Sequence, residues 1–215
     1  MVFKVSLIIF AFQFSGLKEK IIQKAQYLFV SFGFKTVTMD DIANDLAISK
    51  KTIYNFFQNK TELVDATANN LHDQLVLGIS IIRKKSNDPI NEFFEVKDLV
   101  MEHLHDQRNH SIYQLEKFYP EIYSKVKRKH LDFMIKSFGE VLSNGIKFGL
   151  FRKSIDVDFI SRVYFNSISG LMNPEIYPSK IYTLDSCLEN YREYFLRSIV
   201  TTKGLKKLDS ILKND

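Results

Sequence analysis

The chain has 215 residues, enough for one domain or two small ones with a sizeable core, and its eight glycines and four prolines are too few for the many turns of a sandwich or barrel. The single cysteine, Cys187, excludes an intrachain disulfide and a zinc site with several thiolates, which fits a reducing compartment. The net charge is +5, and most of it lies in residues 17–60, which contain seven lysines and four acidic residues. A local excess of positive charge attracts phosphate groups.

The first segment in chain order is an apolar N-terminal arm, residues 1–16. Its uncharged run continues from Val5 to Leu17 over 13 residues, whereas a membrane-spanning helix needs about 17–25. The run follows Lys4 as in a signal peptide, but no small-residue cleavage motif comes after it. We therefore predict either a frayed or packed arm, or sequence upstream of the true translation start, in a cytoplasmic protein without a membrane partner.

Residues 18–57 predict three consecutive helices. Apolar residues recur at helical spacing from Ile21 to Phe32, and Gly33 then ends the first helix. Thr38 and Ser49 are each placed to cap a shorter helix of about eight residues, and a short turn joins the two. Two capped helices at this separation form a helix-turn-helix, whose second helix fits the major groove of DNA.

The second of these short helices, from Lys50 to about Phe57, has two different faces. Ile53 and Phe57 lie four residues apart and predict the side that packs on the domain core. The opposite face carries side chains that can bond phosphates or base edges, namely Lys50, Lys51, Thr52, Tyr54 and Asn55. The pattern alone also fits a solvated face on a small helical subdomain. Backbone N–H groups at the two capped N-termini favour DNA binding, because they can receive phosphate.

The remainder of the chain is also helical in pattern, without strand-like alternation. Asn59 and Glu62 form a capping box at the start of a fourth helix, and Asn173 to Pro178 is a loop. The predicted helices span residues 59–83, 88–107, 120–145, 156–172 and 185–202, and Gly204 interrupts the last one. The predicted fold class is therefore all-α, with an N-terminal three-helix domain followed by a larger helical domain.

Several motifs occur together in the first quarter of the chain. They are A-x-x-L-F at 25–29, G-F at 33–34, T-M-D-D-I-A at 38–43, I-S-K-K-T-I-Y-N-F-F at 48–57 and N-K-x-E-L at 59–63. Residues from about 18 to 63 thereby resemble the DNA-binding domain of the TetR family of bacterial transcriptional regulators. The resemblance implies a helix-turn-helix domain over 17–60 and a ligand-binding and dimerisation domain over 61–215. Ala47 departs from the family, which usually has Gly in the turn; a left-handed Ala costs roughly 1 kcal/mol there.

The resemblance also implies how the chain meets DNA. Thr38 would contact phosphate at the start of the second helix, and Lys60 would do so at the start of the fourth. The full set of candidate DNA-binding residues is Thr38, Ser49, Lys50, Lys51, Thr52, Tyr54, Asn55 and Lys60. The expected partner is a pseudo-palindromic operator in double-stranded DNA, and half-sites about 34–36 Å apart require a homodimer.

In the TetR family the last two long helices form the dimer interface, which implies two apolar stripes here. They are Ile160, Val163, Ser167 and Leu171, and Leu188, Tyr191, Phe195 and Ile199; both stripes fit an intramolecular core equally well. The resemblance further implies a cavity for a small apolar or amphipathic effector. Its candidate lining residues are Phe94, Met101, His105, Tyr113, Phe133 and Phe138, for which plain core packing is the alternative.

Motifs for catalysis or metal binding are missing from the sequence. It has no G-x-S-x-G, H-E-x-x-H or phosphate-binding loop, and Glu102-x-x-His105 has no second copy to complete a di-iron site. We therefore predict no enzyme activity, no catalytic residue, no metal and no cofactor. The predicted function is a sequence-specific DNA-binding transcriptional regulator, a repressor released by a small ligand. A DNA-binding activator or nucleoid factor without a ligand, and an all-helical enzyme or scaffold, are the alternatives.

Overall fold

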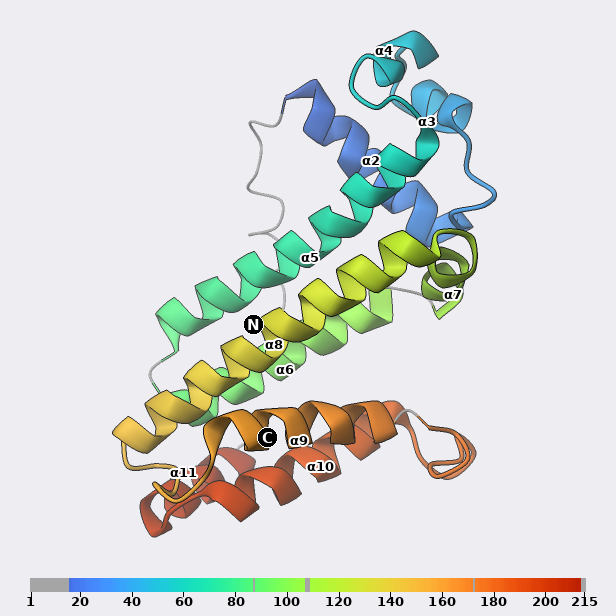
Figure 1. The fold of residues 1–215 in the computed structure, drawn as a ribbon. Coiled ribbons are helices and arrows are strands. Elements are labelled where there is room, and N and C mark those ends of the chain that lie inside the picture. The colour runs from blue at the N-terminus through green and yellow to red at the C-terminus, as the bar shows by residue number, and fades with distance from the viewer. Residues whose placement is uncertain (1–15, 87, 107–108, 172, 214–215) are drawn as a thin grey trace. The chain divides into compact units, whose positions relative to one another are not determined.

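The computed structural model describes residues 16–86, 88–106, 109–171 and 173–213, and within these ranges every regular element is a helix (Figure 1). The all-α prediction is confirmed; in the same ranges β-type pairing is limited to an isolated antiparallel bridge between Phe151 and Val200. The helices are α2 (Leu17–Phe32), α3 (Met39–Asp45), α4 (Lys50–Tyr54), α5 (Lys60–Lys85), α6 (Pro89–Asp106), α7 (Asn109–Phe118), α8 (Pro120–Lys147), α9 (Val157–Leu171), α10 (Leu184–Ile199) and α11 (Thr202–Leu212). Apart from Gly16, the predicted arm lies outside the described residues. None of the helices described here has both the length and the apolar character to cross a bilayer.

The chain divides into two compact units. The first unit comprises Met1–Lys84 and Val96–His130, and the second unit comprises Lys85–Glu95 and Leu131–Asp215. These limits differ from the predicted boundary at residue 60, because the start of α5 buries its apolar residues in the same core as α2, α3 and α4. Helices α6 and α8 contribute residues to both units.

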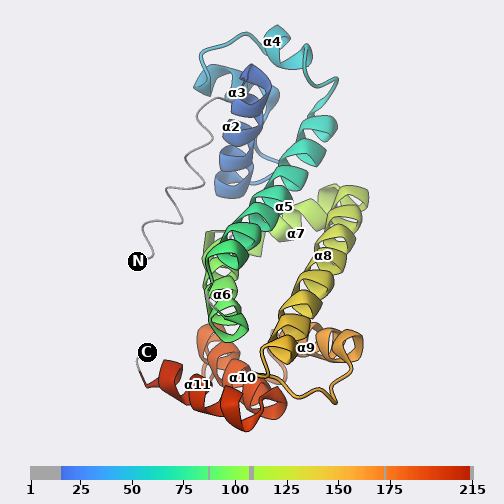
Figure 2. The ribbon, with the colours of Figure 1, turned by 90° about the vertical axis from the view of Figure 1, so that its left-hand side faces the viewer.

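The core of the first unit fixes the position of α4. In both views, α2, α3 and α4 gather around the N-terminal end of α5 (Figure 2). Ile53 is fully buried and Phe57 is 2% exposed, so the predicted inward face of the second short helix is confirmed. Burial of each of these side chains contributes about 1.5–3 kcal/mol. The two residues therefore anchor a helix that has only five residues.

Helix α4 ends at Tyr54 and not near Phe57 as predicted. The backbone N–H groups of Phe56 and Phe57 both donate to the Ile53 carbonyl, at 2.9 and 3.0 Å. This tightening of the last turn ends the helix and directs Phe57 into the core.

The second unit has an aromatic core. Its residues come from the start of α6, the end of α8, and α9 to α11. The ring centre of Phe138 lies 4.5 Å from that of Tyr164 and 5.8 Å from that of Phe195. Such aromatic pairs contribute about 0.5–1.5 kcal/mol beyond the burial of their area. Aromatic packing therefore joins three helices of this unit.

Two features of the helices differ from the sequence prediction. Helix α7 has no counterpart among the predicted helices, and the last break comes before Thr201 instead of at Gly204. The Thr201 hydroxyl accepts a hydrogen bond from the Gly204 N–H at 3.1 Å and so caps α11. Gly204 lies inside α11. The residue there has to be a glycine, because a Cβ would clash with the Leu150 carbonyl oxygen. The glycine thus permits a close approach of two backbones instead of ending a helix.

The turn between α3 and α4 contains a left-handed residue. Ala47 has a φ of 53°. Its N–H donates to the Asn44 carbonyl at 3.1 Å, and the N–H of Ile48 donates to the Ala43 carbonyl at 3.0 Å. These bonds hold Ala47 in a region where its Cβ is unfavourable.

Replacing this residue by glycine should stabilise the chain. We expect Ala47→Gly to raise the free energy of unfolding by about 1 kcal/mol, because glycine has no Cβ penalty at positive φ. Urea denaturation followed by circular dichroism measures the change. Ala66→Gly, inside α5, is the control and should lower stability by about 1 kcal/mol. If both variants lose stability equally, the turn is not strained.

Candidate nucleic-acid interface

Helix α4 presents its polar residues to solvent. Lys50, Lys51, Tyr54 and Asn55 are exposed and Thr52 is half-buried, while Ile53 points into the core. The structure therefore places the predicted DNA-facing residues of this helix on one accessible surface. They offer two ammonium groups, a phenol and an amide, which suit phosphate oxygens and base edges.

Side-chain caps fix the start of both short helices. The Thr38 hydroxyl accepts a hydrogen bond from the Asp41 N–H at 3.2 Å, and the Asp41 carboxylate accepts from the Thr38 N–H at 2.7 Å. The backbone and side-chain hydrogen bonds from Thr38 lower the pKa of Asp41. In α4, the Ser49 hydroxyl accepts from the Thr52 N–H at 3.1 Å. Thr38 and Ser49 are thus engaged in capping, a role that the sequence predicted beside their proposed DNA contacts.

Lys50 is held across the helix-turn-helix by an acidic residue. Its ammonium donates to the Asp40 carboxylate of α3 at 2.7 Å, and this bond raises the pKa of Lys50. The pair is exposed, so its contribution to stability is small. Asp40 therefore partly neutralises a cation on the proposed DNA-facing surface.

Lys60, the first residue of α5, is half-buried. Its ammonium donates to the Lys35 carbonyl at 3.3 Å and lies 5.7 Å from the centre of the Phe29 ring. Burial lowers the pKa of this ammonium. The predicted phosphate contact therefore belongs to a residue that also links the start of α5 to α2 and the α2–α3 loop.

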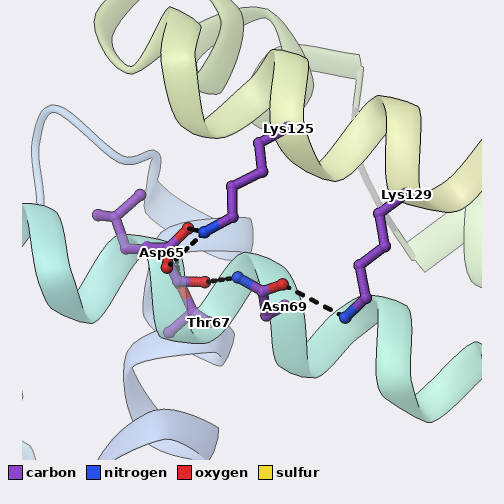
Figure 3. Close-up of polar contacts among 6 residues, drawn as sticks. Asp65, Thr67, Asn69, Lys125 and Lys129 are labelled. Atoms are coloured by element: carbon purple, nitrogen blue, oxygen red, sulfur yellow. Dashed lines mark hydrogen bonds and ion pairs between the residues drawn. The ribbon is translucent and has the colours of Figure 1, made fainter.

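Long-range polar contacts connect the start of α5 to α8. In Figure 3, Lys125 and Lys129 of α8 extend toward α5, where they contact Asp65 and Asn69. Lys125 lies 3.4 Å from the Asp65 carboxylate, and Lys129 lies 3.4 Å from the Asn69 amide oxygen and 3.0 Å from the Asp73 carboxylate. These partners are about 60 residues apart, so no local pattern in the sequence indicates them.

A further contact ties α7 to the helix-turn-helix. The Gln114 amide oxygen accepts a hydrogen bond from the Lys35 N–H at 2.9 Å. A Cβ at Gly33 would lie 2.5 Å from the same amide group, so glycine is required for the close approach. Helix α7 is therefore bonded to the loop that precedes α3, whereas α8 is bonded to α5.

The predicted effector-pocket residues do not form one group. Phe94 and Phe138 belong to the aromatic core of the second unit, Phe133 is half-buried, and Tyr113 is a 55% exposed residue of the first unit. The side chains of Met101 and His105 lie outside the described residues. A groove of about 490 Å³ between α8 and α9 has a different lining: Asp132, Ile135, Lys136, Gly139, Val157, Asp158, Ser161 and Arg162.

The predicted dimer stripes are largely turned inward. Leu188, Phe195 and Ile199 of α10 are buried within the second unit, whereas Val163 of α9 is exposed. Other apolar residues of these helices face solvent, with Phe159 62% and Tyr194 73% exposed. The i, i+4 spacing marks a packed face of a helix, but it does not distinguish a core from an interface.

Comparison with known proteins identifies the helix-turn-helix. Residues 21–67 match the family described as bacterial regulatory proteins, tetR family. Residues 21–67 are therefore a TetR-family DNA-binding domain. The chain is a DNA-binding transcriptional regulator, as the sequence predicted.

Individual relatives match the chain over different lengths. YhgD of Bacillus subtilis, an uncharacterised HTH-type regulator, is 46% identical over 48 residues, which span 22% of this chain and 25% of that protein. The HTH-type transcriptional repressor KstR2 of Mycobacterium tuberculosis is 26% identical over 160 residues, covering 70% of this chain and 76% of the repressor. A transcriptional regulator from Cytophaga hutchinsonii has the same fold, with a TM-score of 0.74 at 19% identity over 87% of this chain and 100% of that one.

Removing the Asp40 charge should strengthen DNA binding. We expect Asp40→Asn to free Lys50, raise the affinity for duplex DNA and steepen the slope of log K against log salt by about 0.9. Fluorescence anisotropy across a salt series measures both quantities.

The matched control is Asp45→Asn. Asp45 also pairs with a lysine, Lys24, at 2.6 Å, but neither residue lies on α4. This control should leave the salt slope unchanged. Equal effects of the two substitutions would mean that Lys50 does not meet DNA.

Proposed function

We propose that this TetR-family chain is a cytoplasmic homodimeric repressor that leaves its operator when a small molecule binds the second unit. The single observation that carries the DNA-binding part is the geometry of α4, where polar residues are exposed opposite the buried Ile53. The proposed direction of control draws support from KstR2, a relative described as a repressor.

Release by a ligand has a physical route through the helices that belong to both units. Residues 120–130 of α8 lie in the first unit and its remaining residues lie in the second. A ligand that favours one position of α8 acts on α5 through Lys125 and Lys129, which contact Asp65 and Asp73. Because only five residues separate the end of α4 from the start of α5, a displacement of α5 changes the direction of the DNA-facing surface. The ligand then shifts the population toward dimers whose two α4 helices no longer match successive grooves.

Selection from random duplex DNA tests the proposed function directly. The full-length protein should enrich an inverted repeat whose half-sites are about 34–36 Å apart, the spacing of one helical turn. Enrichment of a single unpaired half-site would contradict the dimer, and enrichment of nothing would contradict operator binding.

Asn55 should determine part of the base preference. With the selected operator, Asn55→Ala should cost roughly 1–3 kcal/mol and relax selection at one base pair, because Asn can pair with adenine through two hydrogen bonds. Lys51→Ala is the control: a lost phosphate contact should weaken all duplexes alike and lower the salt slope by about 0.9. An Asn55 variant with unchanged selectivity would remove the residue from the recognition set.

The exposed apolar residues of α9 and α10 should form the dimer interface. We expect Phe159→Glu to give a helical monomer with weak operator binding, because it places a charge on a desolvated surface. Sedimentation velocity and circular dichroism measure assembly and folding separately. Tyr27→Glu, at an exposed aromatic of α2, should remain dimeric. A dimer that tolerates Phe159→Glu would place the interface elsewhere.

A further inference from the structure

Arg192 is a buried cation on the apolar face of α10. It follows Leu188 by four residues and precedes Phe195 by three, so it occupies the same helical stripe as these core residues. The residue is only 9% exposed. Burial of a guanidinium is unfavourable unless hydrogen-bond acceptors or an opposite charge compensate it.

The compensation for Arg192 is incomplete. Its guanidinium carbon lies 4.1 Å from the centre of the Phe94 ring, which gives a cation–π contact on the face of the group. The N–H groups point along the edge of the guanidinium plane and need acceptors of their own. The Nε–H has no hydrogen-bond acceptor in the part of the chain that the structure describes. A buried donor therefore remains unsatisfied.

Tyr164 of α9 is close enough to Arg192 for the arginine charge to act on its phenol, and it packs against the aromatic core that contains Phe94. The Tyr164 ring of α9 stacks on Phe138 at 4.5 Å and meets Phe93 at 5.5 Å between ring centres. Burial strongly raises the pKa of the Tyr164 phenol, and the nearby positive charge of Arg192 opposes this only in part. The phenol therefore stays protonated and can donate a hydrogen bond. Phe94, Tyr164 and Arg192 come from three helices of the second unit.

We propose that Arg192 binds the carboxylate of a small lipophilic acid and that such acids are the effector class of this regulator. A carboxylate presents two acceptors in one plane, which match the edge of a guanidinium, and its charge compensates the buried cation. An aromatic or alkyl body attached to it would pack against the aromatic side chains. A neutral ligand would leave the Nε–H unsatisfied, so the site discriminates by charge. This inference rests on the proposed release by a ligand in the second unit.

Matched acids and amides test the charge requirement with the full-length protein. The probes are phenylacetate with phenylacetamide, and octanoate with octanamide, in thermal-shift and calorimetric titrations. We expect at least one acid to raise the Tm and to bind roughly ten- to a hundredfold more tightly than its amide, since it alone forms the charge-assisted hydrogen bonds. Equal binding of acid and amide, or binding of neither acid, would overturn the proposal.

Variants of Arg192 separate ligand binding from a structural role. Arg192→Gln should weaken acid binding roughly ten- to a hundredfold, and Arg192→Lys should recover part of it, because lysine keeps the charge without the planar fork. Arg197→Gln is the control, since Arg197 lies on the exposed side of α10 and pairs with Glu193 and Asp209. It should bind the acid as the unaltered chain does.

The Tm measured without ligand tests whether Arg192 has a structural role. Replacing an arginine that stabilises the fold would lower this Tm. Arg192→Met should keep or raise the Tm, because it removes a buried charge while filling the same space. A lower Tm for this variant, together with unchanged acid binding, would make Arg192 a structural residue and overturn the proposal.

Operator binding distinguishes failure of this inference from failure of the proposed function. The selected operator duplex is titrated by anisotropy with and without the acid that binds. Release from DNA supports both proposals. Acid binding that depends on Arg192 but leaves the operator bound supports a carboxylate site and contradicts its role as the effector site. Operator binding by a protein that no acid stabilises contradicts only the carboxylate site.

Discussion

The DNA-facing surface depends on the burial of Ile53 and Phe57 in the core of the first unit. Helix α4 has five residues, too few to be stable alone, because helix formation has an unfavourable nucleation step. Capping by Ser49 defines where the helix starts, but only the core defines which way it faces. The polar residues are presented to DNA because the apolar ones cannot leave the core without losing several kcal/mol of burial energy.

Polar contacts around this core set positions and add little stability. The Lys50–Asp40, Lys125–Asp65 and Lys129–Asp73 pairs are solvent-exposed, and such pairs contribute about 0–1 kcal/mol each. The apolar core stabilises the helix-turn-helix, whereas the links to α7 and α8 are weak enough to rearrange at little cost in free energy. Under the proposed release by a ligand, stability and switching would depend on different interactions.

The second unit combines tight aromatic packing with a buried charge that is only partly compensated. Its core contains four aromatic rings in mutual contact, those of Phe93, Phe138, Tyr164 and Phe195. Arg192 lies on the same side of α10 as Phe195. A leucine or methionine at position 192 would avoid the desolvation of a guanidinium. Burial of the guanidinium is therefore unfavourable for folding, and the proposed carboxylate would compensate it. The same reasoning separates it from Arg197, whose charge is paired at the surface.

The sequence by itself determined the helices α2 to α4, their caps at Thr38 and Ser49, and the inward side of α4, because each depends on residues within one or two turns of one another. The features that the sequence left open or predicted wrongly depend on residues far apart in the chain. Gly204 allows an approach to Leu150 instead of breaking a helix, and the α10 stripe packs within its own unit. Only the tertiary structure decided these, since a glycine or an i, i+4 apolar pattern has the same local form whichever surface it meets.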